Sequence, residues 1–276
     1  MRLDAHQHFW HYVPEHYPWI TDGLSLLKRD YMPADLEPDL SALGFDGTIA
    51  VQARQDVGDT AFLLALADRH RLIKGVVGWV DLCSPDVGRQ LDAYAPHPAL
   101  VGVRHIVHDE PDDDFMLRPD FRAGIARLQE YGLTYDLLLF PKHLSRAVRL
   151  VDEFPDQPFV LDHIAKPLMR ERRMWPWDED IRRLAECPNV VCKLSGLVTE
   201  AQWDTWQPAE IRPYLDVVVE AFGTSRLMIG SDWPVCTLAA DYARTMGLVI
   251  DYVNHRHPHA ADAIFGGNAA AFYDVG

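Results

Sequence analysis

The sequence is poor in the features that mark secreted, membrane-spanning or disulfide-stabilised proteins. It contains four cysteines in 276 residues, and no two of them form a CxxC pair. Buried thiols in a reducing compartment fit this usage better than a disulfide scaffold. No run of about 18 apolar residues occurs, and the opening MRLDAH has no apolar signal-peptide stretch. We therefore expect a cytoplasmic protein without a membrane partner.

Positive charge is also scarce. The chain has 26 lysines and arginines against 41 aspartates and glutamates, which gives a formal net charge of −15. Such a surface repels phosphate backbones, so we expect no nucleic-acid partner. The fractions of hydrophobic residues (48%) and charged residues (24%) are those of an ordinary globular chain and exclude a disordered one.

Short apolar runs recur along the chain, and each is followed by a helix-like stretch. Their starts lie on average about 32 residues apart, close to the length of one strand–helix unit. The eight predicted strands lie near residues 2–6, 47–53, 73–80, 100–106, 134–140, 159–163, 190–195 and 226–231. Amphipathic helices are predicted over 60–70, 121–131, 213–222 and 242–252, and long Trp/Pro-rich loops over 9–33 and 167–181.

The strands are apolar along nearly their whole length, which is typical of a parallel sheet covered by helices. No GxGxxG sequence follows any strand, so the main reason to prefer an open dinucleotide-binding sheet is missing. No linker or change of composition divides the chain. We therefore predict one α/β domain over 1–276, a (β/α)₈ TIM-type barrel, with its active site at the carboxyl ends of the strands.

The first predicted strand ends in His6 and His8, which are two residues apart. Residues i and i+2 of a strand point to the same side and can hold one metal ion. Taken alone the pair is weak evidence, because 13 histidines produce about 0.6 such pairs by chance. The Pro-broken segment 255–259 supplies two more pairs, which we interpret as a solvated loop.

Two further strands end in residues with metal-binding or catalytic potential, namely His163 and Asp232. Each has a structural alternative, since His163 could be a hydrogen-bonded core histidine and Asp232 a helix cap. Arg104 and Lys193 could likewise form ion pairs inside the barrel. The conjunction of His6, His8, His163 and Asp232 at the ends of separate strands is much harder to explain by structure alone.

Several motifs together resemble the amidohydrolase superfamily. They are DAHQHFW, VGVRH, LDHIAKP, KLSGLVTEA, GSDWPV and FGGNAAAFY, and they extend from the first strand to the last helix. The resemblance is strongest to the branch of sugar-lactone hydrolases that includes L-fuconolactonases and L-rhamnonolactonases. It implies hydrolysis of a sugar-acid lactone, such as L-fuconolactone or a related L-sugar lactone, and leaves the sugar and the oligomeric state open.

The family pattern matches His6, His8, His163 and Asp232, and the chemistry of lactone opening adds Arg104 and His105 as candidates. Asp232 is predicted to be the general base, with His163 beside it. Arg104 would stabilise the oxyanion, and His105 would donate a proton to the leaving oxygen. His6, His8 and Asp232 could hold a single divalent ion, with zinc preferred, or catalysis could need no metal. Arg104 stands where two-metal members place a bridging ligand, so a second ion is not expected.

Other polar and aromatic residues near strand ends are candidates for substrate binding. Gln52, Asp136 and Lys193 could bind sugar hydroxyls. Trp10, Trp79 and Trp233 could stack on apolar sugar faces, although core packing is the alternative for each of them.

Two other functions remain open at this point. A decarboxylase, or a hydrolase of an aromatic-derived carboxylated lactone, would need several arginines at the barrel mouth, where Arg54 and Arg104 are available. A non-catalytic sugar-binding barrel would have no use for a carboxylate beside three histidines.

Overall fold

The computed structural model describes residues 1–276 and contains one eight-stranded parallel sheet with the strands in chain order. The strands are β1 (Leu3–Gln7), β2 (Gly47–Val51), β3 (Ile73–Gly78), β4 (Leu100–His105), β5 (Thr134–Leu137), β6 (Phe159–Leu161), β7 (Val190–Leu194) and β8 (Leu227–Ile229). Two backbone hydrogen bonds join the segment after β8 to β1, from Asp232 N to His6 O (2.8 Å) and from His8 N to Trp233 O (2.7 Å). The predicted barrel and its eight strands are confirmed.

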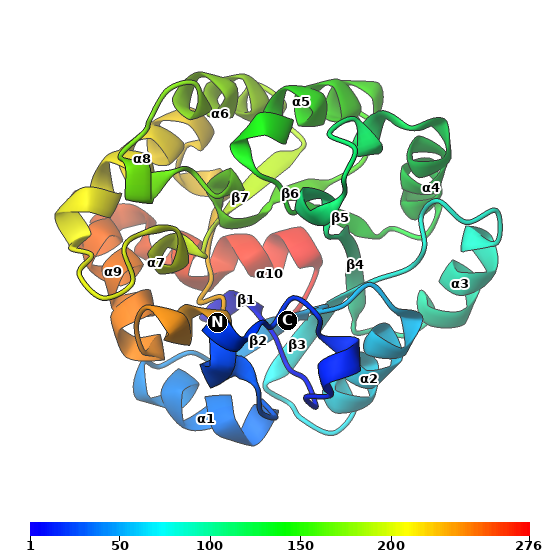
Figure 1. Cartoon of the computed structure of the whole chain (residues 1–276), viewed down its shortest axis with the longest axis horizontal. Coiled ribbons are helices and arrows are strands. Elements are labelled where there is room, and N and C mark those ends of the chain that lie inside the picture. The colour runs from blue at the N-terminus through cyan, green and yellow to red at the C-terminus, as the bar shows by residue number, and fades with distance from the viewer.

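Most of the helices form a ring outside the strands, and α10 lies across the barrel, as the view down the barrel shows (Figure 1). The helices are α1 (Pro33–Ala42), α2 (Val57–Ala67), α3 (Val87–Tyr94), α4 (Pro119–Glu130), α5 (Leu144–Glu153), α6 (Trp177–Ala185), α7 (Leu197–Glu200), α8 (Pro208–Phe222), α9 (Tyr242–Arg256) and α10 (Asn268–Tyr273). None of them is long and apolar enough to cross a membrane.

Several predicted boundaries were wrong for local reasons. Helix α2 begins three residues earlier than predicted, because the Asp56 side chain caps it by accepting from Gly58 N at 2.8 Å. Helix α8 begins at Pro208 and carries Pro213 inside it, whereas we had taken Pro213 as its start. Helix α6 occupies the end of the predicted loop 167–181, and α9 continues to Arg256, so His255 is helical.

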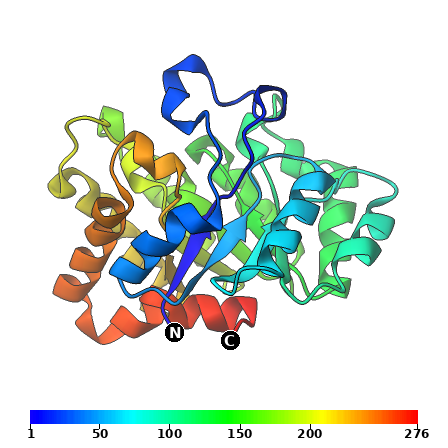
Figure 2. The same cartoon turned by 90° about the horizontal axis from the view of Figure 1, so that it is seen from below.

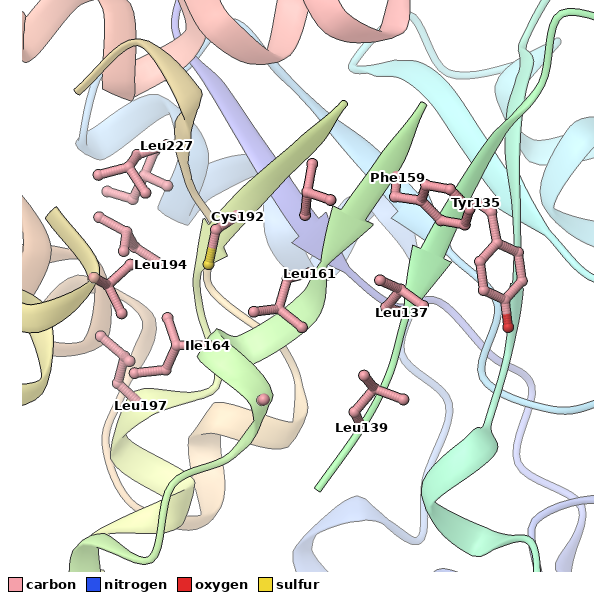
Figure 3. Packing of buried hydrophobic residues seen from close by; sticks show 14 of the residues in the cluster. Tyr135, Leu137, Leu139, Phe159, Leu161, Ile164, Cys192, Leu194, Leu197 and Leu227 are labelled. Carbon is pink, nitrogen blue, oxygen red and sulfur yellow. The ribbon is translucent and has the colours of Figure 1, made fainter. Parts of the chain in front are cut away.

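Successive side chains of a strand point alternately toward the helices and into the barrel. The protein therefore has an outer core between the strands and the helices and an inner core inside the barrel. In β7, Cys192 and Leu194 face the helices, where they pack with residues such as Leu161 and Leu227 (Figure 3). The intervening Lys193 points into the barrel, where it meets Asp136 of β5. Most buried apolar side chains thus lie in the outer core, while charged residues occupy the barrel interior toward the carboxyl ends of the strands.

A small apolar cluster lies inside the barrel at the end where the chain begins and finishes. It combines strand residues such as Leu3, Val77 and Met228 with Ala269 and Tyr273 of α10. Helix α10 crosses this end of the barrel, and the segment after β1 rises from the opposite end (Figure 2). The amino-terminal mouth is therefore plugged, so a substrate can enter only at the carboxyl ends of the strands.

A buried carboxylate reinforces the seam between β1 and β8. Asp4 Oδ1 accepts from Ser231 N (2.9 Å) and from His6 N (3.1 Å). Its Oδ2 accepts from the Ser231 hydroxyl (2.6 Å) and from the Tyr242 hydroxyl of α9 (3.2 Å). Four donors converge on one side chain, so Asp4 joins the first strand, the last strand and the last long helix.

Replacing this carboxylate by an amide should weaken the barrel seam. Asp4→Asn turns one acceptor oxygen into a donor that faces other donors, and we expect the free energy of unfolding to fall by about 2 kcal/mol. Urea denaturation followed by circular dichroism measures the change, with Asp204→Asn at an exposed aspartate as the matched control. Equal stability of the two variants would contradict the role given to Asp4.

Candidate active site

A cavity of about 270 Å³ opens at the carboxyl ends of the strands. Its lining comes from the ends of six strands, β1, β2, β4, β5, β6 and β8, and from the segments that follow them. The lining residues are His8, Trp19, Ala53, Arg104, Ile106, His108, Asp109, Leu138, His163, Lys166, Asp232 and Val235. Four of them, His8, Arg104, His163 and Asp232, are residues for which the sequence predicts a catalytic or metal-binding role.

The two histidines of β1 are positioned by an irregularity in the strand. The pairing of β1 with β2 shifts by one residue between Asp4 and Gln7. A bulge of this kind redirects the side chains that follow it. Ala5 lies in the inner apolar cluster, and His6, the next residue, also reaches the barrel interior, where its Nδ1 lies 3.3 Å from Asp162 Oδ1. The bulge thus aims His6 into the barrel and His8 at the cavity.

Each of these histidines presents its Nε2 atom to the other. His8 Nδ1 hydrogen-bonds to Val51 O at 2.8 Å, so it carries the proton and Nε2 keeps a lone pair. His6 Nε2 also presents a lone pair, because the group that faces it is the Arg104 guanidinium, which can only donate. The two Nε2 atoms are 3.3 Å apart, and Arg104 Nη1 donates to His6 Nε2 at 3.2 Å. Two lone pairs at this separation call for a cation between them.

Asp232 and His163 sit on strained backbone. Asp232 has φ 58° and His163 has φ 54°, in the left-handed region that non-glycine residues rarely adopt. Asp232 Oδ1 lies 3.3 Å from His8 Nε2 and 3.7 Å from His163 Nε2. His163 Nδ1 hydrogen-bonds to the Ser195 hydroxyl at 2.8 Å. Strain of about 1–3 kcal/mol per residue is retained where the surroundings hold a functional group in place.

A glycine makes room for the His163 ring. A Cβ atom on Gly196 would lie 2.6 Å from the His163 Cγ and Nδ1 atoms, and Gly196 itself has φ 60°. Any other residue would displace the ring and strain the turn after β7. The KLSG sequence at the end of β7 therefore positions His163 in two ways. The Ser195 hydroxyl hydrogen-bonds to the ring, and Gly196, which has no side chain, leaves space for it.

Beneath the cavity lies a buried network of two carboxylates and two cations. Asp162 Oδ2 accepts from Arg104 Nη1 at 3.0 Å, and Asp162 Oδ1 lies 3.1 Å from Lys193 Nζ. Lys193 Nζ also donates to Asp136 at 2.5 Å. The Tyr273 hydroxyl donates to Asp136 at 3.1 Å from below. The network is neutral in charge, and its members are essentially inaccessible to solvent.

The charge of Asp232, by contrast, is not balanced by lysine or arginine. Its ion-pair partners within 4 Å are His6, His8 and His163. Burial by itself raises the pKa of Asp232, but the three histidines outweigh it and hold the pKa below 3.8. Burial also lowers the pKa of His6 well below 6.5 and that of His163 to about 3, so these two rings are neutral at pH 7. An anionic site lined by neutral imidazoles suits a bound cation.

The donor set His6, His8 and Asp232 fits one metal ion. Its ligand atoms are separated by 3.3 Å between the two histidines, 3.3 Å from His8 to Asp232 and 3.8 Å from His6 to Asp232. Tetrahedral zinc with bonds of about 2.0–2.1 Å needs ligand atoms about 3.3 Å apart. A second set, His6 with Asp162 and His163, also has its ligand atoms close together. Asp162 is already neutralised by Arg104 and Lys193, so this set is a poorer ligand group.

His105, predicted as a proton donor, does not line the cavity. Its Nδ1 accepts from Trp79 Nε1 at 3.3 Å, and its Nε2 lies 2.7 Å from Glu110 Oε1. The ring stacks on Phe115 with centroids 4.7 Å apart. Both nitrogens are thus engaged in a contact that joins the ends of β3 and β4, and Trp79 is part of the same contact rather than of the cavity wall.

The other residues predicted to bind substrate also lie behind the cavity. Trp10 and Trp233 are buried and pack against Tyr31, with centroid distances of 5.3 and 5.2 Å. Gln52 Nε2 donates to Arg104 O at 3.2 Å, and Gln52 O accepts from Arg104 Nη2 at 2.5 Å. Gln52 therefore positions Arg104. Asp136 and Lys193 belong to the buried network, and Arg54 pairs with Asp59 outside the cavity.

Four polar or aromatic cavity residues were not predicted from the sequence. Trp19 lies on the Trp/Pro-rich loop after β1, and its Nε1 donates to Ala53 O at 3.3 Å. His108 and Asp109 follow β4, and Lys166 follows β6 within the LDHIAKP motif. The motif was a signal for Lys166. No sequence signal indicated His108 and Asp109, because they lie beyond the end of β4 in a stretch of mixed polar residues.

Comparison with known proteins places this barrel and its site in one class. The fold and the ligand set at the strand ends define a (β/α)₈ barrel with a polar cavity at its carboxyl-terminal face. The sequence profile of the family described as Amidohydrolase matches residues 3–275. The chain belongs to the amidohydrolase family.

Individual relatives agree with this assignment over the full length of the chain. An L-fucono-1,5-lactonase of Burkholderia multivorans is 41% identical, with 99% of this chain and 96% of the relative covered. An L-fucono-1,5-lactonase of Burkholderia ambifaria is 37% identical with the same coverage. A crystal structure of a Burkholderia multivorans amidohydrolase with bound zinc superposes with a TM-score of 0.97 at 40% identity, and both chains are covered completely.

The buried network should make stability depend on pH. Burial raises the pKa of Asp136 to about 6, against the lowering effect of Lys193. A raised carboxyl pKa favours the folded state below about pH 4, and this contribution is lost as the pH rises through 6. Asp136→Asn removes the titration, so its free energy of unfolding should fall less between pH 4 and pH 7 than that of the wild type, by up to about 3 kcal/mol.

Denaturation curves of both proteins at several pH values measure this difference. Asp204→Asn, at an exposed carboxylate, should follow the wild type. Parallel pH profiles for the wild type and Asp136→Asn would show that Asp136 titrates with an ordinary pKa.

Proposed function

We propose that the chain hydrolyses sugar-acid lactones, with L-fucono-1,5-lactone or a related L-sugar lactone as substrate. The observation that carries the proposal is the convergence of Asp232, His8, His163 and Arg104 on one cavity of about 270 Å³, with His6 buried within 4 Å of Asp232. That volume suits a single sugar ring. The full-length similarity to L-fucono-1,5-lactonases supports the same substrate class.

Opening a lactone requires an activated water, a stabilised oxyanion and a protonated leaving oxygen. Asp232 is the general base, because it is ionised, faces the cavity and has neutral neighbours that do not neutralise it. His163 and His8 orient the water beside Asp232. Arg104 supplies a permanent positive charge at the cavity wall, held in place by Asp162 and by the Gln52 carbonyl.

His6, His8 and Asp232 would hold a single divalent ion, with zinc as the preferred metal. When bound, such an ion polarises the lactone carbonyl and lowers the pKa of water. Arg104 competes with it, because its guanidinium donates to the His6 Nε2 lone pair that the ion would use. Arg104 also supplies positive charge at the place where it is needed. The ion is therefore of limited importance for turnover.

The cavity disfavours the carboxylated aromatic substrates of the alternative hypothesis. Such substrates call for several arginines, and Arg104 is the single arginine in the lining, with Arg54 paired elsewhere. The lining is instead divided between apolar side chains and groups that can exchange hydrogen bonds with hydroxyls. A binding protein without catalysis would not need the strained backbone at Asp232.

Replacing Asp232 by asparagine should abolish most turnover. The amide keeps the shape but cannot accept a proton from water, and a positioned base contributes about 10²–10⁴ in rate. A pH-indicator assay with L-fucono-1,5-lactone, corrected for spontaneous hydrolysis, measures kcat, and Asp204→Asn serves as the control for a lost surface carboxylate. Near-normal kcat in Asp232→Asn would move the general base to His163.

Metal removal should reduce activity only modestly. We expect at most one equivalent of metal per chain by elemental analysis of the purified protein, and a loss of less than about tenfold in kcat after chelation, since Arg104 stays in place. His8→Ala should lower the metal content. Two equivalents per chain, or complete inactivation reversed by zinc or manganese, would contradict the single-ion site.

A further inference from the structure

One wall of the cavity has no part in the chemistry assigned so far. It is formed by Lys166, His108 and Asp109. Lys166 follows the short helical turn Asp162–Ala165 after β6, and the other two residues belong to the turn Val107–Asp109 after β4. Lys166 Nζ donates to Glu200 Oε1 of α7 at 3.1 Å. The Lys166 side chain is 15% exposed and lines the cavity.

The backbone leading to Lys166 is strained over four consecutive residues. His163, Ile164, Ala165 and Lys166 have φ values of 54°, 48°, 60° and 50°. None of them is glycine, so a left-handed turn of this length is costly. It is held by the Lys166 N–H, which donates to His163 O at 2.8 Å, and by Trp177 Nε1, which donates to Ile164 O at 2.7 Å. The turn brings Lys166 to the same cavity as His163.

Lactone opening needs a proton donor for the ring oxygen, and the other cavity residues are poorly suited to this task. Arg104 cannot give up a proton at physiological pH. The His163 nitrogens face Ser195 and Asp232. Burial, with added repulsion from Lys166 and Arg104, lowers the pKa of His108, so its imidazole is uncharged. Lys166 is the remaining cation with a transferable proton.

We propose that Lys166 is a catalytic residue, the general acid that protonates the departing ring oxygen. This assignment rests on the proposed lactone hydrolysis. Water gives its hydroxide to the carbonyl carbon and its proton to Asp232. The bond between that carbon and the ring oxygen then breaks while Lys166 Nζ gives a proton to the oxygen, which becomes the product hydroxyl. Asp232 releases its proton to solvent, and Lys166 takes one up.

The charged neighbours of Lys166 are compatible with this role. Glu200 on α7 and Asp109 on the turn after β4 supply negative charge, and Arg104 and the neutral His108 lie on the same cavity wall. Glu200 therefore acts as a positioning residue that holds the ammonium in place. The arrangement puts the acid, Lys166, and the base, Asp232, on the same cavity as two separate groups, as attack on one atom and departure of another require.

The test is chemical rescue of Lys166→Ala. We expect kcat on L-fucono-1,5-lactone to fall by about 10²–10⁴, with a much smaller change in KM. Added methylammonium, which carries a transferable proton, should restore kcat in proportion to its concentration. Tetramethylammonium, which carries charge without such a proton, should not. Lys142→Ala, at an exposed lysine outside the cavity, is the matched control, and circular dichroism checks that each variant is folded.

Three outcomes would overturn the assignment. A rise in KM with kcat unchanged would make Lys166 a substrate-binding residue. If kcat is lowered and neither amine restores it, or both restore it equally, Lys166 contributes a positive charge to the site and does not donate the proton. An active wild type with an unaffected Lys166→Ala would overturn this assignment alone, whereas a wild type inactive on every aldonolactone would overturn the proposed function with it.

Discussion

The contact between Asp162 and the two cations beside it, Arg104 and Lys193, fixes the geometry of the whole site. The Asp162 carboxylate lies 3.0 Å from Arg104 Nη1, 3.1 Å from Lys193 Nζ and 3.3 Å from His6 Nδ1. All four side chains are buried. Removing Arg104 or Lys193 would leave an uncompensated charge inside the barrel, which typically costs about 3–5 kcal/mol. The network therefore specifies one arrangement of the strands β1, β4, β6 and β7 and sets the tautomer of His6.

The neutrality of this network explains why Asp232 is available for chemistry. Two carboxylates and two cations satisfy one another below the cavity floor, so neither lysine nor arginine pairs with Asp232. The remaining negative charge lies beside the neutral rings of His6 and His163, where it can accept a proton or bind a cation. The same buried ion pairs that constrain the fold thereby leave the Asp232 carboxylate without a lysine or arginine partner at the surface of the cavity.

The fold was predictable because its signals are local and repeated. Apolar strands about 32 residues apart specify a helix-covered parallel sheet. The predicted helices were wrong at ends that a cap such as Asp56 determines, and α6 begins within a stretch predicted as a loop. The site was predictable where a residue ends a strand, as for His163 and Asp232. It was not predictable where contacts with neighbouring residues determine the direction of a side chain. Trp10, Trp79 and Gln52 also stand at or just after strand ends, but their side chains face other protein groups.

Left-handed backbone places three of the polar residues that line the cavity. Asp232, His163 and Lys166 are left-handed without being glycine, and all three line the cavity, whereas Trp79, His105 and Gln52 have ordinary backbone there. Left-handed φ values turn a side chain away from the direction that the strand would give it. The conformation has to be maintained by bonds elsewhere, such as the one from Asp232 N to His6 O that also closes the barrel. The hydrogen bond that helps to close the barrel thus also holds Asp232 in its active-site conformation. An active site built from the ends of the first and last strands therefore depends on closure of the barrel.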